Sequence, residues 1–177
     1  MKIKEKYKKI VVPGMKKKFG YKNELAVPKI MKVVLNTGIG SLKDTAKKET
    51  IEKSFIAIAG QKSKVNLAKK SIASFKSRQG MPIGYSVTLR GQRMYDFLEK
   101  MIDVSLPRTR DFKGIDPNIL DDSGNLTIGF KEHIVFPEAS GEDTRSAFGL
   151  GVVVVTNAKS KEESLEMLKL MGFPFRI

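Results

Sequence analysis

The stretch GQKSKVNLAKKSIASFKSRQGMPIGYSVTLRG, residues 60–91, carries both the clearest strand pattern and the most uneven charge of the chain. From Tyr85 to Arg90 apolar and polar side chains alternate, which is typical of a strand with one buried and one polar face. No Asp or Glu occurs from Lys53 to Tyr95, although nine Lys and Arg residues do. A surface that binds a polyanion excludes negative charge. The stretch therefore predicts the RNA-contacting part of an RNA-binding protein.

Composition narrows the class of protein. The 177 residues are 41% hydrophobic, enough for one core, and the net charge of +14 favours a nucleic acid or an anionic membrane as partner. A basic protein that is merely soluble is the simpler alternative. The absence of Cys excludes disulfides, thiolate nucleophiles and Cys-based zinc sites. No apolar run reaches the roughly 18 residues of a spanning helix, so we expect a cytoplasmic protein.

The rest of the chain mixes strands and helices. Strands are expected at 29–36, 64–67, 84–90, 126–130 and 150–156, and helices at 43–59, 92–106 and 160–171. Gly60 and Pro107 are expected to end the first two helices, and Ser160 with Glu163 forms a capping box at the third. Residues 69–82 are expected to be a long loop. We predict one domain, 1–177, of the α+β class, with an antiparallel or mixed sheet, helices on one face and an open RNA-binding face.

The two flanking regions differ in charge. Residues 2–18 hold eight Lys and one Glu, with apolar residues at near-helical spacing that Pro13-Gly14 should break or restart. This helix either contacts RNA or a membrane, or docks on the core with a solvated basic face. Residues 111–144 hold eight acidic residues against Lys113 and Lys131, which indicates a second surface for a basic partner or simply solvated loops.

Enzyme chemistry is not supported. His133 is the only His and is interpreted as a surface or packing residue, because no partner nucleophile or metal motif accompanies it. Gly38-Ile39-Gly40-Ser41 lacks the third glycine of a dinucleotide-binding loop and is no Walker loop, so it is either a tight turn or a phosphate contact before a helix. We expect no catalytic residues, no cofactor and no metal. A nucleotide-dependent enzyme remains the third alternative.

RNA recognition fits the residue types better. Lys and Arg supply affinity for phosphate, and several polar side chains suit sugars and base edges: Asn36, Gln61, Asn66, Ser86 and Thr88. Tyr85 and Phe75 are isolated, so no aromatic platform for single-stranded bases is present. We expect recognition of structured RNA by its shape and backbone.

Motifs along nearly the whole chain resemble one family. They are LNTGIG (35–40), GQK (60–62), AKKSIA (68–73), FKSRQGMPIG (75–84), VTLRG (87–91), PRTRDF (107–112), FPE (136–138) and GFPFR (172–176). In this order they are similar to the bacterial-type large-subunit ribosomal protein five family, which binds 5S ribosomal RNA. The resemblance implies an α+β fold whose open sheet face meets 5S RNA in the central protuberance.

The resemblance also implies residue roles. For ribosomal RNA the implied contacts are Asn36, Gln61, Thr88, Lys62, Lys69, Lys70 and Arg90. A projecting loop at 75–82 would approach the tRNA in the peptidyl site with Lys76, Ser77, Arg78, Gln79, Gly80, Met81 and Pro82. An inter-subunit bridge to a basic small-subunit protein would use Glu138, Glu142, Asp143 and Arg145. Neighbouring large-subunit proteins and RNA are further implied partners, and a membrane is not.

Four positions depart from the family pattern. Ser63 stands where Pro is usual, and Asn66 and Leu67 stand where Thr and a basic residue are usual, which removes one phosphate contact. His133 stands where Gln is common. The alternative to ribosomal RNA binding is a general polyanion or membrane-surface binder that uses the basic N-terminal helix.

Overall fold

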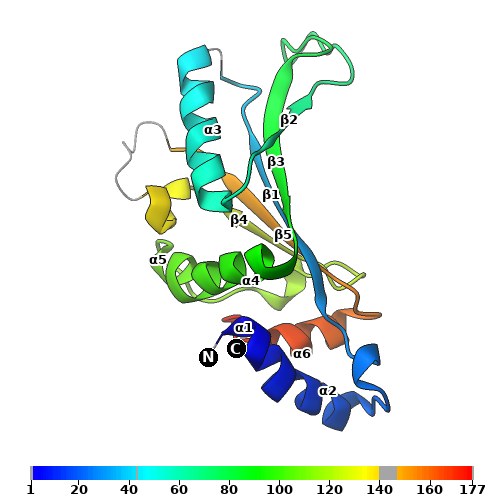
Figure 1. Cartoon of the computed structure of the whole chain (residues 1–177). Helices are drawn as coiled ribbons and strands as arrows, with labels where there is room; N and C mark the ends of the chain where they lie inside the picture. Colours follow the sequence, from blue (N-terminus) through cyan, green and yellow to red (C-terminus); the bar gives the residue numbers. More distant parts are fainter. Residues whose placement is uncertain (1, 43, 140–146, 177) are drawn as a thin grey trace. The chain divides into compact units, whose positions relative to one another are not determined.

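The computed structural model describes residues 2–42, 44–139 and 147–176. Five strands form one open antiparallel sheet in the order β2-β3-β1-β5-β4 (Figure 1). The strands are β1 (Ile30–Gly38), β2 (Lys64–Leu67), β3 (Pro82–Leu89), β4 (Leu126–Phe130) and β5 (Leu150–Thr156). The helices are α1 (Ile3–Lys6), α2 (Val12–Phe19), α3 (Thr45–Ala59), α4 (Gly91–Lys100), α5 (Leu106–Arg108) and α6 (Lys161–Met171). This is the α+β class that the sequence predicts.

The chain divides into two compact units. Unit 1 comprises Met1–Val33, Leu89–Ile128 and Val153–Ile177, and unit 2 comprises Val34–Thr88 and Gly129–Val152. Strands β1, β3, β4 and β5 each contribute residues to both units. That the whole chain acts as a single RNA-binding domain stays a prediction, and each unit is described by itself below.

In unit 1 the basic N-terminal segment is one continuous helix. α1, a π-helical turn η1 (Tyr7–Val11) and α2 follow one another without a break. Its apolar residues Ile3, Val11 and Met15 are buried, and the helix contacts α6. Gly14 allows this contact to be close, because a Cβ there would lie 2.9 Å from Leu170 Cδ1. The helix is thus docked on its unit.

Two prolines lie inside helices of unit 1, each two residues after a π turn. Before Pro13, the Val12 N–H bonds to the Tyr7 carbonyl; before Pro107, the Leu106 N–H bonds to the Met101 carbonyl at the end of η3 (Met101–Ser105). A proline ring clashes with the carbonyl four residues earlier in a regular α-helix, and the wider turn relieves that clash. Of the two outcomes predicted for Pro13-Gly14, the helix does not break; the regular α-helix α2 starts at Val12, directly before Pro13. The prediction that Pro107 ends its helix was wrong, since α5 runs to Arg108.

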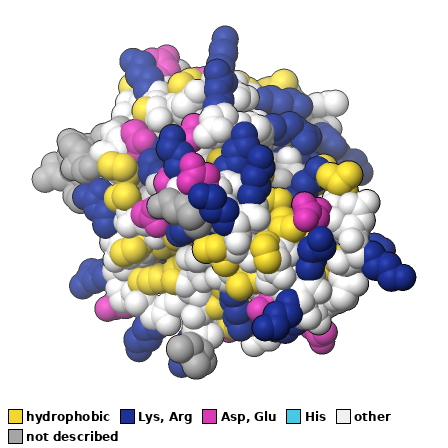
Figure 2. Space-filling view, turned by 60° about the horizontal axis from the view of Figure 1, so that its bottom comes forward, with side chains coloured by type: hydrophobic (Ala, Val, Ile, Leu, Met, Phe, Trp, Pro, Cys, Tyr) yellow, Lys and Arg dark blue, Asp and Glu magenta, His cyan; other side chains and the backbone are white. Residues whose placement is uncertain are grey.

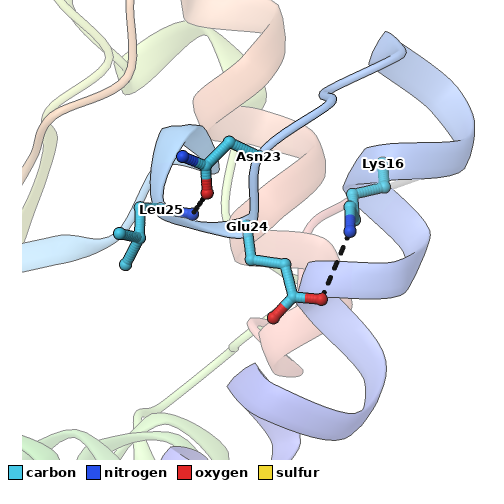
Figure 3. A network of polar contacts seen from close by, with 4 residues as sticks. All are labelled: Lys16, Asn23, Glu24 and Leu25. Atoms are coloured by element: carbon cyan, nitrogen blue, oxygen red, sulfur yellow. Dashed lines mark hydrogen bonds and ion pairs between the residues drawn. The ribbon is translucent and has the colours of Figure 1, made fainter.

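A short polar network joins the N-terminal helix to the segment that leads into β1. The Asn23 side chain accepts a hydrogen bond from the Leu25 N–H at 2.9 Å and so caps the 3₁₀ turn η2 (Glu24–Ala26). Lys16 Nζ lies 3.2 Å from Glu24 Oε1 (Figure 3). Lys16 of the basic helix is thus paired with an acidic residue of the same unit.

In unit 2, α3 covers one side of the strands. Asp44 caps the start of α3 by accepting a hydrogen bond from the Ala46 N–H at 3.0 Å, and Gly60 ends the helix with a φ of 65°, as the sequence predicts. Phe55 of α3 is fully buried. The Tyr85 hydroxyl lies 3.5 Å from the Lys48 carbonyl oxygen, so α3 faces the side of β3 that carries Tyr85.

Candidate nucleic-acid interface

Alternation along the strands of unit 2 separates a covered face from an open one. In β1 the side chains of Leu35 and Thr37 are buried, whereas Asn36 between them is exposed. In β3 the side chains of Tyr85 and Val87 are buried, whereas Thr88 is exposed. The register of β2 against β3 places Lys64 opposite Ser86 and Asn66 opposite Gly84. Directly opposite residues point to the same face of a sheet. We call the following side the open face: Asn36, Lys64, Asn66, Gly84, Ser86, Thr88 and Gly151.

None of the residues that define the open face is acidic. The carboxylates of α3 lie on the other side, where Glu52 accepts a hydrogen bond from Ser63 at 3.2 Å. Burial raises the pKa of Tyr85, and the negative charges of Glu52 and then Glu49 raise it further. Because Tyr85 points to the covered face, these acids lie on the opposite side of the sheet from the open face. An anionic ligand on the open face therefore makes no direct contact with them.

Asn36 lies flat against the neighbouring strand. A Cβ placed on Gly151 of β5 would overlap the Asn36 Oδ1 and lie 3.1 Å from Cγ and 3.2 Å from Nδ2. The next residue, Thr37, is anchored on the covered face, where its hydroxyl donates to the Gly149 carbonyl at 2.8 Å. Asn36 therefore sits at a fixed position on the open face with its amide along the sheet surface.

The other residues implied for ribosomal RNA lie around this face. Thr88 is exposed at the end of β3, and Arg90 is the exposed residue before α4. Gln61 is half-buried and Lys62 exposed in the connection between α3 and β2, so strand alternation does not assign them to either face. Asn36 and Thr88 are thus brought onto one face, whereas Gln61 and Lys62 belong to a neighbouring loop.

Lys69 and Lys70 lie beyond the end of β2. They border a hollow of about 650 Å³ with an apolar lining that includes Ile72, Phe75 and Ile83. Phe75 is 76% exposed, an unusual position for a large aromatic side chain. The lysines therefore flank apolar groups as well as facing solvent, which sequence analysis did not predict.

The connection between β2 and β3 is an ordered projection. It extends past the end of both strands (Figure 1). The Ala68 N–H donates to the Met81 carbonyl, the Gly80 N–H donates to the Ala68 carbonyl, and the Gln79 N–H donates to Ser71 Oγ at 2.9 Å. Ile72 and Ser77 form a β-bridge at its tip. Residues 75–82 are mostly exposed on this hydrogen-bonded extension, so the long loop that the sequence predicts has a defined backbone.

The acidic region is only partly described. Glu138 is exposed in the 3₁₀ turn η6 (Pro137–Ala139) and has an interaction of its own, while Glu142, Asp143 and Arg145 lie outside the described residues. Beside it, His133 is fully buried, stacks on Phe148 at 3.9 Å between ring centroids, and accepts a hydrogen bond from the Phe148 N–H at 3.3 Å. His133 is thus a packing residue, one of the two roles that the sequence left open.

The Gly38–Ser41 turn does not offer α3's N–H groups to a phosphate. The Asp44 carboxylate already occupies that end of the helix by bonding the Ala46 N–H. A carboxylate there repels a second anion. Of the two interpretations of these glycines, the geometry therefore favours the tight turn.

Lysines of unit 1 form a less specific surface. Lys4, Lys8 and Lys9 are exposed on the N-terminal helix, but its apolar side is buried within the unit. Lys18 pairs with Glu166 of α6 at 2.6 Å. In the view of Figure 2, Lys and Arg side chains stand at separate places around the surface with Asp and Glu among them.

Comparison with known proteins decides the family. A family model described as ribosomal protein L5 matches residues 23–78, and a second one, described as the C-terminus of the same ribosomal family, matches residues 82–175. A curated protein of Alkaliphilus oremlandii is 49% identical over 174 residues, 98% of this chain and 97% of its own length. One of Desulforapulum autotrophicum is 50% identical over 175 residues, 98% of both chains. Both are named large ribosomal subunit protein uL5.

The chain belongs to the ribosomal protein L5 family. As a member of this family it is a structural component and not an enzyme, which agrees with the expectation from the sequence. In the described ranges, no cluster of three or more His, Cys, Asp or Glu residues is placed to hold a metal ion. Among the helices of those ranges, none combines the length and apolar character needed to cross a membrane.

Proposed function

We propose that this member of the ribosomal protein L5 family is a constituent of the large ribosomal subunit that binds 5S ribosomal RNA through the open face. The observation that carries the proposal is the open face itself, where Asn36 and Thr88 present polar groups on a surface without acidic residues. Fixed side chains on a sheet lose little conformational freedom on binding, so their hydrogen bonds contribute to affinity. Lys62, Lys69 and Lys70, in the loops that adjoin β2, and Arg90, two residues after Thr88 in sequence, supply phosphate contacts.

The proposed complex is tested by binding the full chain to 5S RNA and to an unrelated structured RNA of equal length, at several salt concentrations. We expect tighter binding to 5S RNA at every salt concentration, together with a steep loss of affinity as salt rises, because several phosphates are neutralised. Equal affinity for the two RNAs would favour the general polyanion binder. Binding to anionic lipid vesicles that displaces 5S RNA would favour the membrane-surface alternative.

A second contact of the same function is with tRNA in the peptidyl site. The projection at 75–82 supports this proposal, because it is held by its own hydrogen bonds and carries Lys76 and Arg78 as exposed cations. Crosslinking from position 78 in assembled ribosomes is the test. We expect adducts with tRNA in the peptidyl site, and adducts confined to ribosomal RNA would contradict this part.

The third contact is the bridge to a basic small-subunit protein through Glu138, Glu142, Asp143 and Arg145. What supports it is the surplus of acidic residues in 111–144 of a chain with net charge +14. Reversing Glu138 and Glu142 to Lys should weaken subunit association and leave 5S binding unchanged. Loss of both activities would contradict separate surfaces.

A further inference from the structure

Asn66 of the edge strand β2 and Ser86 of β3 form a polar pair on the open face to which the family resemblance assigns no role. Asn66 lies opposite Gly84 of β3, and its neighbour on the same face, Lys64, lies opposite Ser86. The Ser86 hydroxyl donates a hydrogen bond to Asn66 Oδ1 at 3.1 Å. The pair thus connects the edge strand to β3, two residues before Thr88.

This hydrogen bond restrains the orientation of the Asn66 amide and so determines which of its polar atoms is available to a ligand. Its carbonyl oxygen is occupied by Ser86, so the amide nitrogen is directed away from that hydroxyl. Nδ2 lies near Gly84, where a Cβ would be 3.9 Å away, and no side chain on Gly84 covers it. Within the described residues Nδ2 has no hydrogen-bond partner. Asn66 therefore offers an unpaired amide donor, Nδ2, whose orientation is restrained by the hydrogen bond from Ser86.

Gly84 is required at this place for a separate reason. A Cβ there would lie 2.7 Å from the Thr37 carbonyl oxygen of β1, which is backbone and cannot move aside cheaply. The close approach of β1 thus restricts position 84 to glycine, and glycine places no side chain next to the Asn66 amide.

We propose that Asn66, oriented by Ser86, is a further RNA-contacting residue that donates from Nδ2 to a phosphate or sugar oxygen. Lys64 adds a phosphate contact beside it. The proposal rests on the proposed binding of 5S RNA by the open face and extends that contact to the edge of the sheet. Oxygen acceptors outnumber donors along an RNA backbone, so an unpaired amide donor next to a cation suits this ligand.

The end of β2 limits the contact to these two residues of the strand. The register against β3 shifts between Asn66 and Leu67, so the regular alternation stops there. Leu67 is 55% exposed and its side chain offers no polar group. Asn66 is therefore the last side chain of β2 that can donate a hydrogen bond before the projection begins.

The test measures 5S RNA affinity at several salt concentrations for Asn66→Ala, Asn66→Asp, Ser86→Ala and Lys64→Ala. We expect about a fivefold loss for Asn66→Ala and a larger loss for Asn66→Asp, which removes the donor and adds a negative charge. Lys64→Ala should lower the slope of log K against log salt by about 0.7–0.9, and Asn66→Ala should leave the slope unchanged. Val65→Ala is the matched control, because Val65 lies opposite Tyr85 on the other face of β2 and is 40% exposed.

A double-mutant cycle separates positioning from contact. Ser86→Ala alone should lose about twofold to threefold, because it frees the amide to rotate, and it should have no further effect in the Asn66→Ala background. A full extra loss in that background would overturn the positioning role of Ser86. Thermal unfolding of each variant identifies losses that come from a weakened sheet.

The triple change to Ala of Asn36 and Thr88 on the open face and Gln61 in the adjoining loop separates failure of this proposal from failure of the proposed function. If the triple variant loses affinity while both Asn66 variants bind as Val65→Ala does, the Asn66 contact is refuted and the proposed 5S binding stands. If neither the triple variant nor the Asn66 variants lose affinity, the open face does not bind 5S RNA and both fail.

Discussion

The open face of unit 2 and the lysine-rich helix of unit 1 both suit a polyanion, yet they are built differently. The open face has few charges, and its polar groups are fixed: Asn36 lies against Gly151, and Asn66 is bonded to Ser86. The helix has many charges, but its apolar side is buried and Lys16 and Lys18 pair with acids of their own unit. A count of cations therefore locates a basic surface, whereas fixed hydrogen-bonding groups indicate where an RNA structure is recognised specifically.

The largest effect that separates the two regions concerns stability. Replacing the fully buried Met15 by Ala should lower the free energy of unfolding by about 2–5 kcal/mol, because a cavity opens between the N-terminal helix and its unit. The control is Ile10→Ala, because Ile10 lies on the same helix and is 44% exposed. This variant should change the free energy of unfolding by less than about 0.5 kcal/mol. Chemical denaturation measures both. Equal midpoints for Met15→Ala and wild type would mean that the helix is a free arm.

A second effect concerns salt. Changing Lys62, Lys69 and Lys70 together to Ala should reduce the slope of log K against log salt for 5S RNA by about 0.7–0.9 for each lysine that contacts a phosphate. Lys4, Lys8 and Lys9 are the matched set, with equal charge on the unit 1 helix, and their removal should leave the slope nearly unchanged. The comparison of the two regions breaks down if the slopes fall equally.

A smaller effect isolates one hydroxyl. Thr88→Val keeps the shape of the side chain and removes one donor and acceptor from the open face, so 5S affinity should fall about fivefold. Thr127 is an exposed Thr of β4 outside the proposed contact set, and Thr127→Val should bind as wild type does. A loss shared by both variants would point to a general effect of surface hydroxyls on the protein rather than to a contact.

The smallest effect belongs to the ion pair of Figure 3. Glu24 is 71% exposed and Lys16 34% exposed, so solvent screens their 3.2 Å contact. Glu24→Gln should therefore lower the free energy of unfolding by less than about 1 kcal/mol and leave 5S binding unchanged. Tighter RNA binding in this variant, which frees Lys16, would show that the helix contacts RNA after all.

The sequence was sufficient for the elements whose signals are local. The alternation of 84–90 predicted β3, Gly60 marked the end of α3, and Ser160 marked the start of α6, as the structure confirms. The helix through Pro107 was predicted to stop too early, because a π turn that accommodates proline depends on its surroundings and leaves no local pattern. In the structure, Pro13 and Pro107 each lie six residues after the first residue of a π turn, but the start of that turn cannot be seen in the sequence.

The candidate site was predictable only in part. Asn36 and Thr88 were predicted from their residue types and from the family resemblance, and the structure brings them onto one face. The contact of Asn36 with Gly151 and the hydrogen bond between Ser86 and Asn66 could not be predicted, because the partners lie far apart in sequence and meet only through strand register. The burial of His133 against Phe148 required the fold as well.

The central claim is that directed groups on the open face, and not the density of lysine, read the RNA. The most direct measurement compares the 5S RNA affinity of two triple variants at physiological salt. In the first, Asn36 and Thr88 of the open face and Gln61 of the adjoining loop are changed together to Ala, and in the second Lys4, Lys8 and Lys9 are changed together to Ala. Three lost hydrogen bonds of about 1 kcal/mol each predict roughly a 100-fold loss for the first variant. The second should lose less than about tenfold through its weaker long-range field. An equal loss from the two variants would contradict the claim.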